Sequence, residues 1–413
     1  MPGKAVVIGG GIVGSGSALA LQRAGFAVTL IDPMREPSGA SWGNAGHIAI
    51  EQVEPLASRA VLRSVPGRLF ANGGALDFCL GDFDRWLPFS LRWLAATSPA
   101  RFAKGKSALA TLLGRASDAW RRLAADLGAP GLYREIGHAV VWESAKSAAA
   151  GIAQWQATDV GTAKFHIASA AELARIAPLL RTKPAAAICF ENSGQISDHG
   201  ELALALARTF EARGGERLYQ TARLRHAGDR AAVTFADGKA IDADIILVAA
   251  GAKSGDVLRD EGTFAPLIAE RGYHLRAPVS DRWPSDLGPV AFEDRSLIVG
   301  RFSSAMRASS FVEFGRPDSP PDSKKWARLR QHITELGLPF ALPAETWMGS
   351  RPTLPDYLPA IGRSTRSSNV IYAFGHQHLG LTMGPITSEL VGQLATGSAT
   401  AVPLEPFSLE RFG

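Results

Sequence analysis

The sequence has few cysteines and no long apolar run. Its 413 residues include only Cys79 and Cys189, too few for a disulfide framework or a cysteine-based metal site. A reducing, cytoplasmic setting is therefore expected. No apolar stretch approaches the about 18 residues that a transmembrane helix needs. The first strand begins at once, so we expect no signal peptide.

The net charge is also small, because Lys and Arg together outnumber Asp and Glu by only five. The basic residues read as dispersed, with no basic stripe interleaved with aromatics, so we expect no nucleic-acid partner. The small surplus suits an anionic cofactor, an anionic substrate or an acidic membrane surface. The nine histidines lack metal-ligand spacing, and no metal site is predicted.

What the sequence does contain begins at its first residues. The apolar run 5–8 predicts a strand, a glycine turn follows, and residues 15–23 continue as a helix. The turn places Gly9, Gly11, Ile12, Val13 and Gly14 at a helix N-terminus, where backbone N–H groups can bind a pyrophosphate. A second strand, 27–31, ends in Asp32, whose carboxylate can accept hydrogen bonds from a ribose. Together these features predict a dinucleotide-binding unit.

The next stretch, residues 33–47, is rich in small and polar side chains and predicts a loop. Long loops in compact domains are often functional. This one contains Ser41, Asn44, Ala45 and Gly46, and it could lay backbone N–H groups against a ligand held by the first turn.

Residues 51–190 differ in composition. The segment 69–102 is rich in Phe and Trp and is interrupted by Pro88 and Pro99. We favour a broken helix packed in a second domain, and a membrane-surface patch is the alternative. Apolar residues at steps of three and four predict one amphipathic helix over 108–127.

The remaining sequence returns to α/β character. A buried strand, 244–248, runs into Ala250 and Gly251 at its carboxyl end, the edge where α/β sheets bind ligands. Strands over 273–276, 296–302 and 309–314, with Arg307 in the loop between the last two, and a helix over 326–336 predict a second sheet covered by a helix.

The last segment combines a loop, a strand and a helix. Residues 347–362 predict a proline-punctuated loop, and 370–374 predict a buried strand. A glycine-rich loop over 375–385 then leads to a helix over about 386–394, with Pro385 at its start. This helix start is a second place where an anion could bind.

These motifs together resemble the FAD-dependent amine and amino-acid oxidoreductases of the D-amino-acid oxidase superfamily. The motifs are GGGIVGSG with Asp32, GASWGNAGH, DIILVAAGA, GSRPTLPDYLPAIG and GHQHLGLTMGP. Within the superfamily, the sequence is most similar to the D-amino-acid dehydrogenase small subunit and the hydroxyproline dehydrogenases. The resemblance covers nearly the whole chain.

The resemblance implies an α/β FAD-binding Rossmann-like domain of the glutathione-reductase type and a second α+β substrate domain built on an antiparallel sheet. The FAD-binding domain would be discontinuous, with residues 1–50, 191–268 and 345–413. The substrate domain would comprise residues 51–190 and 269–344.

The same resemblance assigns residues to the cofactor FAD. Gly9, Gly11 and Gly14 would hold its pyrophosphate, and Asp32 its adenosine ribose. Other contacts along the pyrophosphate, the ribityl chain and the flavin would come from Ser41, Asn44, Ala45, Gly46, Ala250, Gly251, Gly380, Leu381 and Thr382. The sequence lacks the cysteine that tethers the flavin in monomeric sarcosine oxidases, so the resemblance implies non-covalent FAD.

Arg351 matches the arginine that binds the substrate carboxylate in this family, and its planar fork suits bidentate binding. His378, Tyr273 and His47 are further candidate catalytic residues. We rank them above His274, His376 and Arg307. A structural role competes with substrate contact for each of these six.

The expected reaction is oxidation of the Cα–N bond of a D-amino acid or cyclic imino acid, with hydride transfer to flavin N5. The imine would be released or hydrolysed to a keto acid and ammonia. A histidine such as His378 or His47 could accept the proton. Alternatives are a hydroxyproline or N-methyl amino acid dehydrogenase, a flavin-binding subunit of a larger complex and an NAD-dependent dehydrogenase.

The electron acceptor stays open between oxygen, a quinone and a partner flavoprotein. We expect a cytoplasmic protein, with peripheral contact to the inner face of the membrane as an open alternative.

Overall fold

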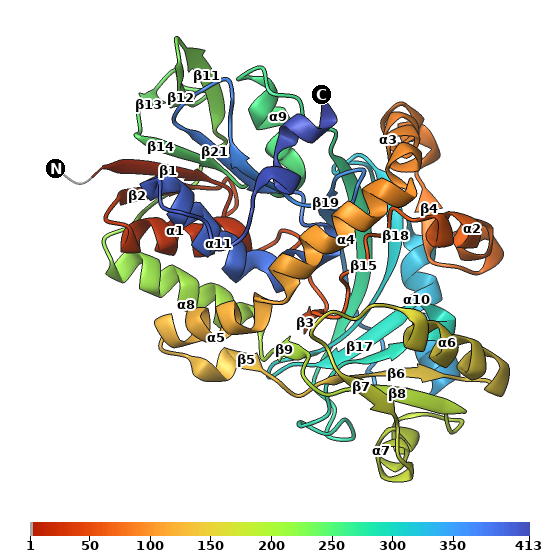
Figure 1. Cartoon of the computed structure of the whole chain (residues 1–413). Coiled ribbons are helices and arrows are strands. Elements are labelled where there is room, and N and C mark those ends of the chain that lie inside the picture. Colours follow the sequence, from red (N-terminus) through yellow and green to blue (C-terminus); the bar gives the residue numbers. More distant parts are fainter. Residues whose placement is uncertain (1–2) are drawn as a thin grey trace.

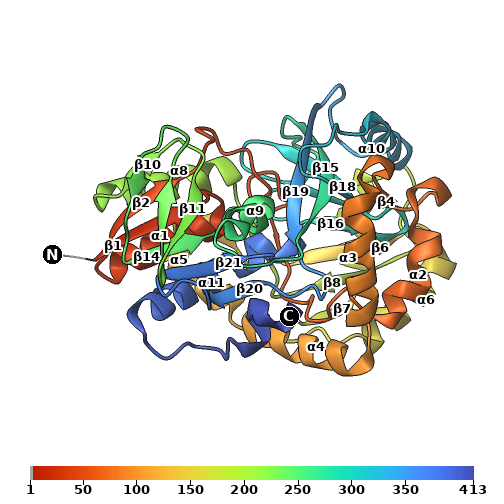
Figure 2. The same cartoon turned by 90° about the horizontal axis from the view of Figure 1, so that it is seen from above.

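The computed structural model describes residues 3–413, and within this range no helix combines the length and the apolar character needed to cross a membrane. Two sheets dominate the molecule and lie beside each other (Figures 1 and 2). The first has six strands in the order β10-β2-β1-β14-β21-β20. Their bounds are Glu216–Leu218, Ala27–Ile31, Lys4–Ile8, Ile245–Val248, Val370–Phe374 and Ala360–Arg363.

The first five of these strands are parallel, and β20 runs antiparallel to β21. Side chains of β1 alternate between two cores, because successive residues of a strand point to opposite faces. Val7 packs on the side of the helices α1 (Ile12–Arg23), α8 (His199–Ala212) and α11 (Gly380–Thr396). Val6 and Ile8 pack against a small sheet of β11 (Arg223–Ala227), β12 (Arg230–Thr234) and β13 (Ala240–Ile241). The sheet is thus covered on both faces, as parallel sheets require.

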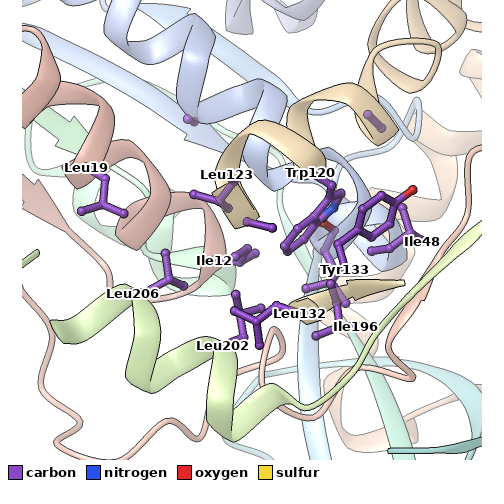
Figure 3. Close-up of a cluster of buried hydrophobic side chains, with 14 of the residues drawn as sticks. Ile12, Leu19, Ile48, Trp120, Leu123, Leu132, Tyr133, Ile196, Leu202 and Leu206 are labelled. Carbon is purple, nitrogen blue, oxygen red and sulfur yellow. The ribbon is translucent and has the colours of Figure 1, made fainter. Parts of the chain in front are cut away.

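Figure 3 shows the core on the helical side, where Ile12 and Leu19 of α1 approach Leu202 and Leu206 of α8. Trp120 of α5 (Ala116–Asp126) joins this core, and its indole N–H donates to the carbonyl of Leu381 at the start of α11 over 3.0 Å. A helix from the segment expected in the substrate domain therefore supports the first sheet.

The second sheet has nine strands, in the order β19-β15-β18-β17-β16-β6-β8-β7, with β4 paired to β18. Most neighbours are antiparallel, and helix α10 (Ser323–Leu336) covers the core on one face. The strands span Glu345–Thr353, Ile268–Ala277, Met306–Gly315, Leu297–Arg301, Val290–Phe292, His138–Trp142, Ala186–Phe190, Phe165–Ile167 and Leu76–Phe78, in the order named. A third, short sheet joins β3 (His47–Ile48), β9 (Gly194–Ile196) and β5 (Tyr133–Arg134).

Strand β19 corrects an expectation. Residues 347–362 were expected to form a loop, but Glu345–Thr353 pairs with β15 and belongs to the second sheet. Pro352 is tolerated because β19 is an edge strand, where one face of the backbone needs no ladder partner. Arg307, expected in a loop, likewise lies in β18.

The helix expected over 108–127 is also corrected. It is two helices, α4 (Pro99–Leu113) and α5, separated at Gly114. The expected apolar face is nevertheless buried, because Leu109, Leu112 and Trp120 are each at most 1% exposed. Helices α2 (Arg59–Arg68) and α3 (Phe83–Ala96) precede this pair, at the end of the molecule away from the N-terminus (Figures 1 and 2). The remaining helices are α6 (Ala145–Ala157), α7 (Ala170–Ile176) and α9 (Ser254–Arg259).

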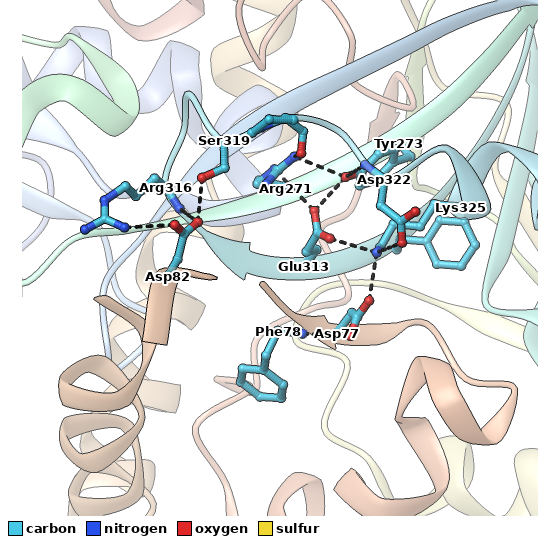
Figure 4. A network of polar contacts seen from close by, with 12 residues as sticks. Asp77, Phe78, Asp82, Arg271, Tyr273, Glu313, Arg316, Ser319, Asp322 and Lys325 are labelled. Carbon is cyan, nitrogen blue, oxygen red and sulfur yellow. Dashed lines mark hydrogen bonds and ion pairs between the residues drawn. The ribbon is translucent and has the colours of Figure 1, made fainter. Parts of the chain in front are cut away.

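A buried polar network ties α10 and β4 to the second sheet (Figure 4). The Lys325 ammonium is fully buried and lies 2.7 Å from the carboxylates of Asp77 and Glu313. Burial alone would lower the pKa of Lys325, but these carboxylates raise it, so the side chain is charged. Glu313 also pairs with the buried Arg271. Removing one charged side chain would leave its buried partners without a counter-charge, so the network holds these elements in one arrangement.

Candidate active site

The turn after β1 is shaped by glycines with different roles. Gly9 has φ +113°, and a Cβ there would come within 2.3 Å of the carbonyl oxygen of Ala249. A Cβ on Gly14 would lie 1.8 Å from the carbonyl oxygen of Gly9, so this residue lets α1 pack against the turn. A Cβ on Gly11 would meet only the Ser41 hydroxyl, at 3.2 Å. Gly11 therefore keeps space free for a ligand rather than for the protein's own packing.

Asp32 directly follows β2, and its side chain faces the same turn. One carboxylate oxygen accepts the backbone N–H of Gly10 over 2.6 Å, and the other accepts that of Met34 over 2.8 Å. The Ser41 hydroxyl accepts the N–H of Ile12 over 3.1 Å. The turn, the strand end and the following loop are thus fixed together.

These residues line a cavity of about 860 Å³ at the carboxyl ends of β1, β2 and β14. This volume lies in the upper part of the range typical of ligand sites. Of the expected cofactor residues, the cavity is lined by Gly9, Gly11, Ile12, Val13, Asp32, Ser41, Asn44, Ala250, Gly251, Gly380 and Leu381. Four expected residues lie outside the lining: Gly14, Ala45, Gly46 and Thr382. Gly14, Ala45 and Thr382 each adjoin a lining residue in sequence, and Gly46 follows Ala45.

The segment after Ser41 is held against the start of α11. Gly46 has φ +76°, its N–H donates to the Asn44 side chain over 2.8 Å, and a Cβ there would come within 2.3 Å of Phe302. The N–H of Ala49 donates to the Thr382 hydroxyl over 3.0 Å. The chain just after Gly46 is therefore in direct contact with the start of α11.

Arg351 projects from β19 into the cavity lining. Its Nη1 donates to Glu270 Oε1 and to the carbonyl of Phe311, both over 3.1 Å. Its Nε and Nη2 form no hydrogen bond with the described residues. A Cβ on Gly272 would lie 2.3 Å from Nη2, so the guanidinium lies directly over the glycine of β15.

Glu270, which sequence reasoning missed, anchors this arginine. It is 1% exposed and also accepts hydrogen bonds from Thr353 and Tyr357, over 3.2 and 3.3 Å. Burial raises the pKa of Tyr357 well above its ordinary value, and the nearby Glu270 carboxylate adds to the effect, so this tyrosine stays a donor. The only sequence signal was an acidic residue two positions before Gly272 in a buried strand.

Tyr273 does not reach the cavity lining, contrary to expectation. Its side chain points to the opposite face of β15, where the hydroxyl donates to Glu313 over 2.6 Å (Figure 4). Burial, followed by this hydrogen bond, raises the pKa of Tyr273 to about 12. Tyr273 thus belongs to the polar network under α10.

The neighbouring His274, ranked lower, does approach the cofactor loop. Its Nδ1 lies 3.0 Å from the carbonyl oxygen of Gly43, and its ring stacks on Trp347 at 4.7 Å between centroids. Burial lowers the pKa of His274 to about 3, so the ring is neutral. Arg307 supports the same loop, because its Nη1 donates to the carbonyl of Asn44 over 2.8 Å.

His47 and His378 also lie outside the described cavity lining. His47 Nε2 is 3.0 Å from Glu51 Oε1, and His378 bonds to Gln52. Burial would raise the pKa of Glu51, but His47 and His138 hold it below its ordinary value. These three side chains lie close enough to coordinate an ion, although the sequence spacing of histidines gave no such sign. His376 does line the cavity, and burial lowers its pKa to about 3.

A family model described as DAO, FAD dependent oxidoreductase, matches residues 4–394. The chain belongs to this family. The D-amino-acid oxidase of Bradyrhizobium diazoefficiens is 33% identical to it, and the match covers 98% of each chain. The expected family and the cofactor FAD are confirmed.

Solved structures of low sequence identity share the fold. Iminodiacetate oxidase from Chelativorans sp. BNC1 is 22% identical, with a TM-score of 0.74 and coverage of 98% of both chains. L-Proline dehydrogenase from P. horikoshii is 19% identical, with a TM-score of 0.72 and coverage of 100% of this chain and 98% of the other. The expected fold class is confirmed.

The residues around the cavity fit FAD. An added Cβ at Gly11 would meet only the Ser41 hydroxyl, the Asp32 carboxylate stands at the end of β2, and the loop at Asn44 leads to the start of α11. Bound there, FAD would supply an acceptor for the electrons that the substrate loses. The protein's own contribution is to bind and orient that substrate.

Proposed function

We propose that this FAD-dependent oxidoreductase oxidises the Cα–N bond of a D-amino acid or a cyclic imino acid. The observation that carries this proposal is Arg351, a cation in the lining of the cofactor cavity with one edge of its guanidinium free. The names of the relatives, which include a D-amino-acid oxidase and an L-proline dehydrogenase, support the same substrate classes.

The free edge of Arg351 suits a carboxylate. Because Nη1 is engaged by Glu270 and Phe311, the two remaining donor groups, Nε and Nη2, can form two parallel hydrogen bonds to one substrate carboxylate. Two such bonds fix both the position and the orientation of the Cα–H bond relative to the flavin. Glu270 holds the arginine in place and balances its charge when no substrate is bound.

The three candidate histidines differ in their access to the cavity. His47 and His378 lie outside the cavity lining, so a proton would reach them only through an intervening group. His376 lines the cavity but is neutral at pH 7 and a weak base. We therefore propose that the substrate is oxidised as the neutral amine, with its proton lost to water. The product imine is then released or hydrolysed to a keto acid and ammonia.

The experiment is a substrate panel on the purified protein. We expect a flavin absorption spectrum that bleaches without oxygen when D-amino acids or prolines are added. If only N-methyl amino acids or hydroxyproline bleach the flavin, the protein is instead an N-methyl amino acid or hydroxyproline dehydrogenase. A protein that retains FAD but is reduced by no member of the panel would favour a flavin-binding subunit, and a colourless protein that binds NAD would overturn the proposal.

Reoxidation separates the electron acceptors. Turnover with oxygen alone would support an oxidase, and turnover only with a dye or quinone would support a dehydrogenase. We propose non-covalent FAD, released by acid precipitation, and a cytoplasmic chain that passes electrons to oxygen, a partner flavoprotein or a membrane quinone.

A further inference from the structure

Helix α3 is apolar on two opposite sides. One side packs onto the second sheet through Trp86, Phe89 and Trp93. The other side carries Phe83, Leu87, Leu91 and Leu94, which are 44–62% exposed, and Leu80 just before the helix is 84% exposed. Apolar side chains of a helix normally face a core that covers them. Within the described chain, nothing covers this second side.

Exposed apolar side chains are concentrated in this part of the molecule. Large hydrophobic residues that are strongly exposed number twelve in the described range, and six of them lie between Leu62 and Leu94. Helix α2, all of which the structure describes, contains no buried residue. Exposed apolar side chains gathered in one part of a molecule are typical of an interaction site.

The same segment carries the chain's positive charge. Residues 59–106 contain eight Lys and Arg against three Asp, an excess equal to the net charge of +5 for the whole sequence. This corrects the interpretation that basic residues are evenly dispersed. Outside the segment, acidic and basic residues balance.

The three acids are already neutralised. Asp77 pairs with the buried Lys325, and Asp82 and Asp84 pair with Arg316. In contrast, six exposed basic residues form no ion pair with any carboxylate of the described chain; they are Arg59, Arg63, Arg68, Arg92, Arg101 and Lys104. An apolar strip on α3, together with unpaired cations on α2, α3 and α4, matches the pattern of helices that lie in an anionic membrane surface.

We propose that α2, α3 and the start of α4 form a membrane-docking surface that binds the headgroups and outer acyl region of an anionic phospholipid bilayer. The apolar strip would enter the bilayer, and the six unpaired cations would contact anionic headgroups. A second copy of the chain fits less well, because a twofold contact would bring the same cations together. A 14-residue helix is also only about 21 Å long, too short by itself for the about 800 Å² per partner of a stable dimer.

The docking surface rests on the proposed function and bears on its electron acceptor, because an enzyme bound to lipid could pass electrons to a quinone in the bilayer. Lipid binding itself can be measured without substrate, so failure of the surface and failure of the amino-acid chemistry are distinguishable.

The test is flotation of the FAD-loaded protein with vesicles. We expect wild type to float with vesicles of equal parts phosphatidylglycerol and phosphatidylcholine, and much less with phosphatidylcholine alone or at high salt. Combining Leu87→Ser, Leu91→Ser and Leu94→Ser should lower the partition coefficient by more than about tenfold. Leu204→Ser, at an exposed leucine on α8, is the matched control and should float like wild type.

A second variant tests the charges and guards against misfolding. Arg92→Glu combined with Arg101→Glu leaves the apolar strip intact and should also abolish flotation, with flavin content and amine oxidation in solution unchanged. Equal flotation of wild type and both variants would overturn the docking surface. So would a wild-type dimer, measured by light scattering, that becomes monomeric in the leucine variant without any lipid binding by wild type.

Discussion

The guanidinium of Arg351 and the carboxylate of Glu270 face each other across neighbouring strands, with Nη1 3.1 Å from Oε1. Glu270 is 1% exposed, and Arg351 keeps 23% of its side chain accessible from the cavity. The pair therefore has a buried end that fixes it and an accessible end that can bind an anion. Removing the arginine would do two things at once: it would remove the anion site and leave a buried carboxylate unpaired.

Arg351→Lys separates these two effects. Lysine keeps the positive charge beside Glu270 but lacks the fork that can form two parallel hydrogen bonds. We expect the KM for the amino-acid substrate to rise by about 10–100-fold, the loss of roughly 1.5–3 kcal/mol from a charged hydrogen bond. FAD content and the thermal midpoint should stay close to wild type. Unchanged steady-state kinetics in this variant would rule out Arg351 as the carboxylate site.

Arg351→Leu is the companion measurement. It should lose the same substrate binding and, in addition, about 3–5 kcal/mol of stability because Glu270 is left buried without its partner. Urea unfolding of both variants measures the difference. A leucine variant as stable as the lysine variant would show that Glu270 does not depend on this ion pair.

Gly272→Ala tests the surface on which the arginine lies. The added methyl group would be 2.3 Å from Arg351 Nη2, so the guanidinium must move. We expect a rise in KM and a fall in kcat, because a displaced carboxylate misorients the Cα–H bond. Gly300→Ala on β17 is the control, since an added Cβ there would meet the end of a different side chain, Gln195 Nε2, at 3.3 Å and would not touch Arg351. Similar kinetics for both alanine variants would contradict the positioning role of Gly272.

Gly11→Val tests the cofactor turn. The valine side chain would fill the space beside Ser41 that the protein itself leaves open, so we expect purified protein without bound FAD. Gly131→Ala, where an added Cβ meets nothing within 4 Å, should retain FAD fully. The ratio of flavin absorbance to protein absorbance measures both. Stoichiometric flavin in Gly11→Val would exclude this turn as the pyrophosphate site.

The dinucleotide turn could be predicted from sequence because all its determinants are local. Gly9, Gly14 and Asp32 lie within about thirty residues, and each acts through backbone geometry or a strand end. Which side chains of β15 point toward the cofactor loop could not be predicted in the same way. Tyr273 and His274 are adjacent, and which of them meets the cofactor loop depends on how the strand pairs, including an irregularity between Arg271 and Tyr273.

Contacts between residues far apart in the chain could not be predicted from the sequence either. Glu270 precedes Arg351 by 81 residues, and only the register of β15 with β19 brings them together. Proline-rich composition suggested a loop at 347–362, yet an edge strand accommodates Pro352. Local composition therefore described the cofactor turn well, while the substrate side depended on strand pairing.

The buried histidines predict how stability depends on pH. Burial lowers the pKa of His138, His274 and His376 from 6.5 to about 3 in the folded protein. The unfolded chain takes up protons below about pH 6.5, whereas the folded chain does not until about pH 3. Stability from these residues is therefore fully present above pH 6.5 and is lost as the pH falls toward 3, by about 1.4 kcal/mol per pH unit for each histidine.

His376→Asn isolates one of these contributions. Asparagine does not titrate in this range and can still bond to the Thr387 hydroxyl, which lies 2.9 Å from His376 Nε2. Between pH 6 and 4 the unfolding free energy of the variant should fall less steeply than that of wild type, by about 1.4 kcal/mol per pH unit. Urea titrations of the FAD-bound proteins measure both slopes. Carboxylates that titrate in this range affect both proteins alike, so equal slopes would mean that His376 is already protonated in the folded state.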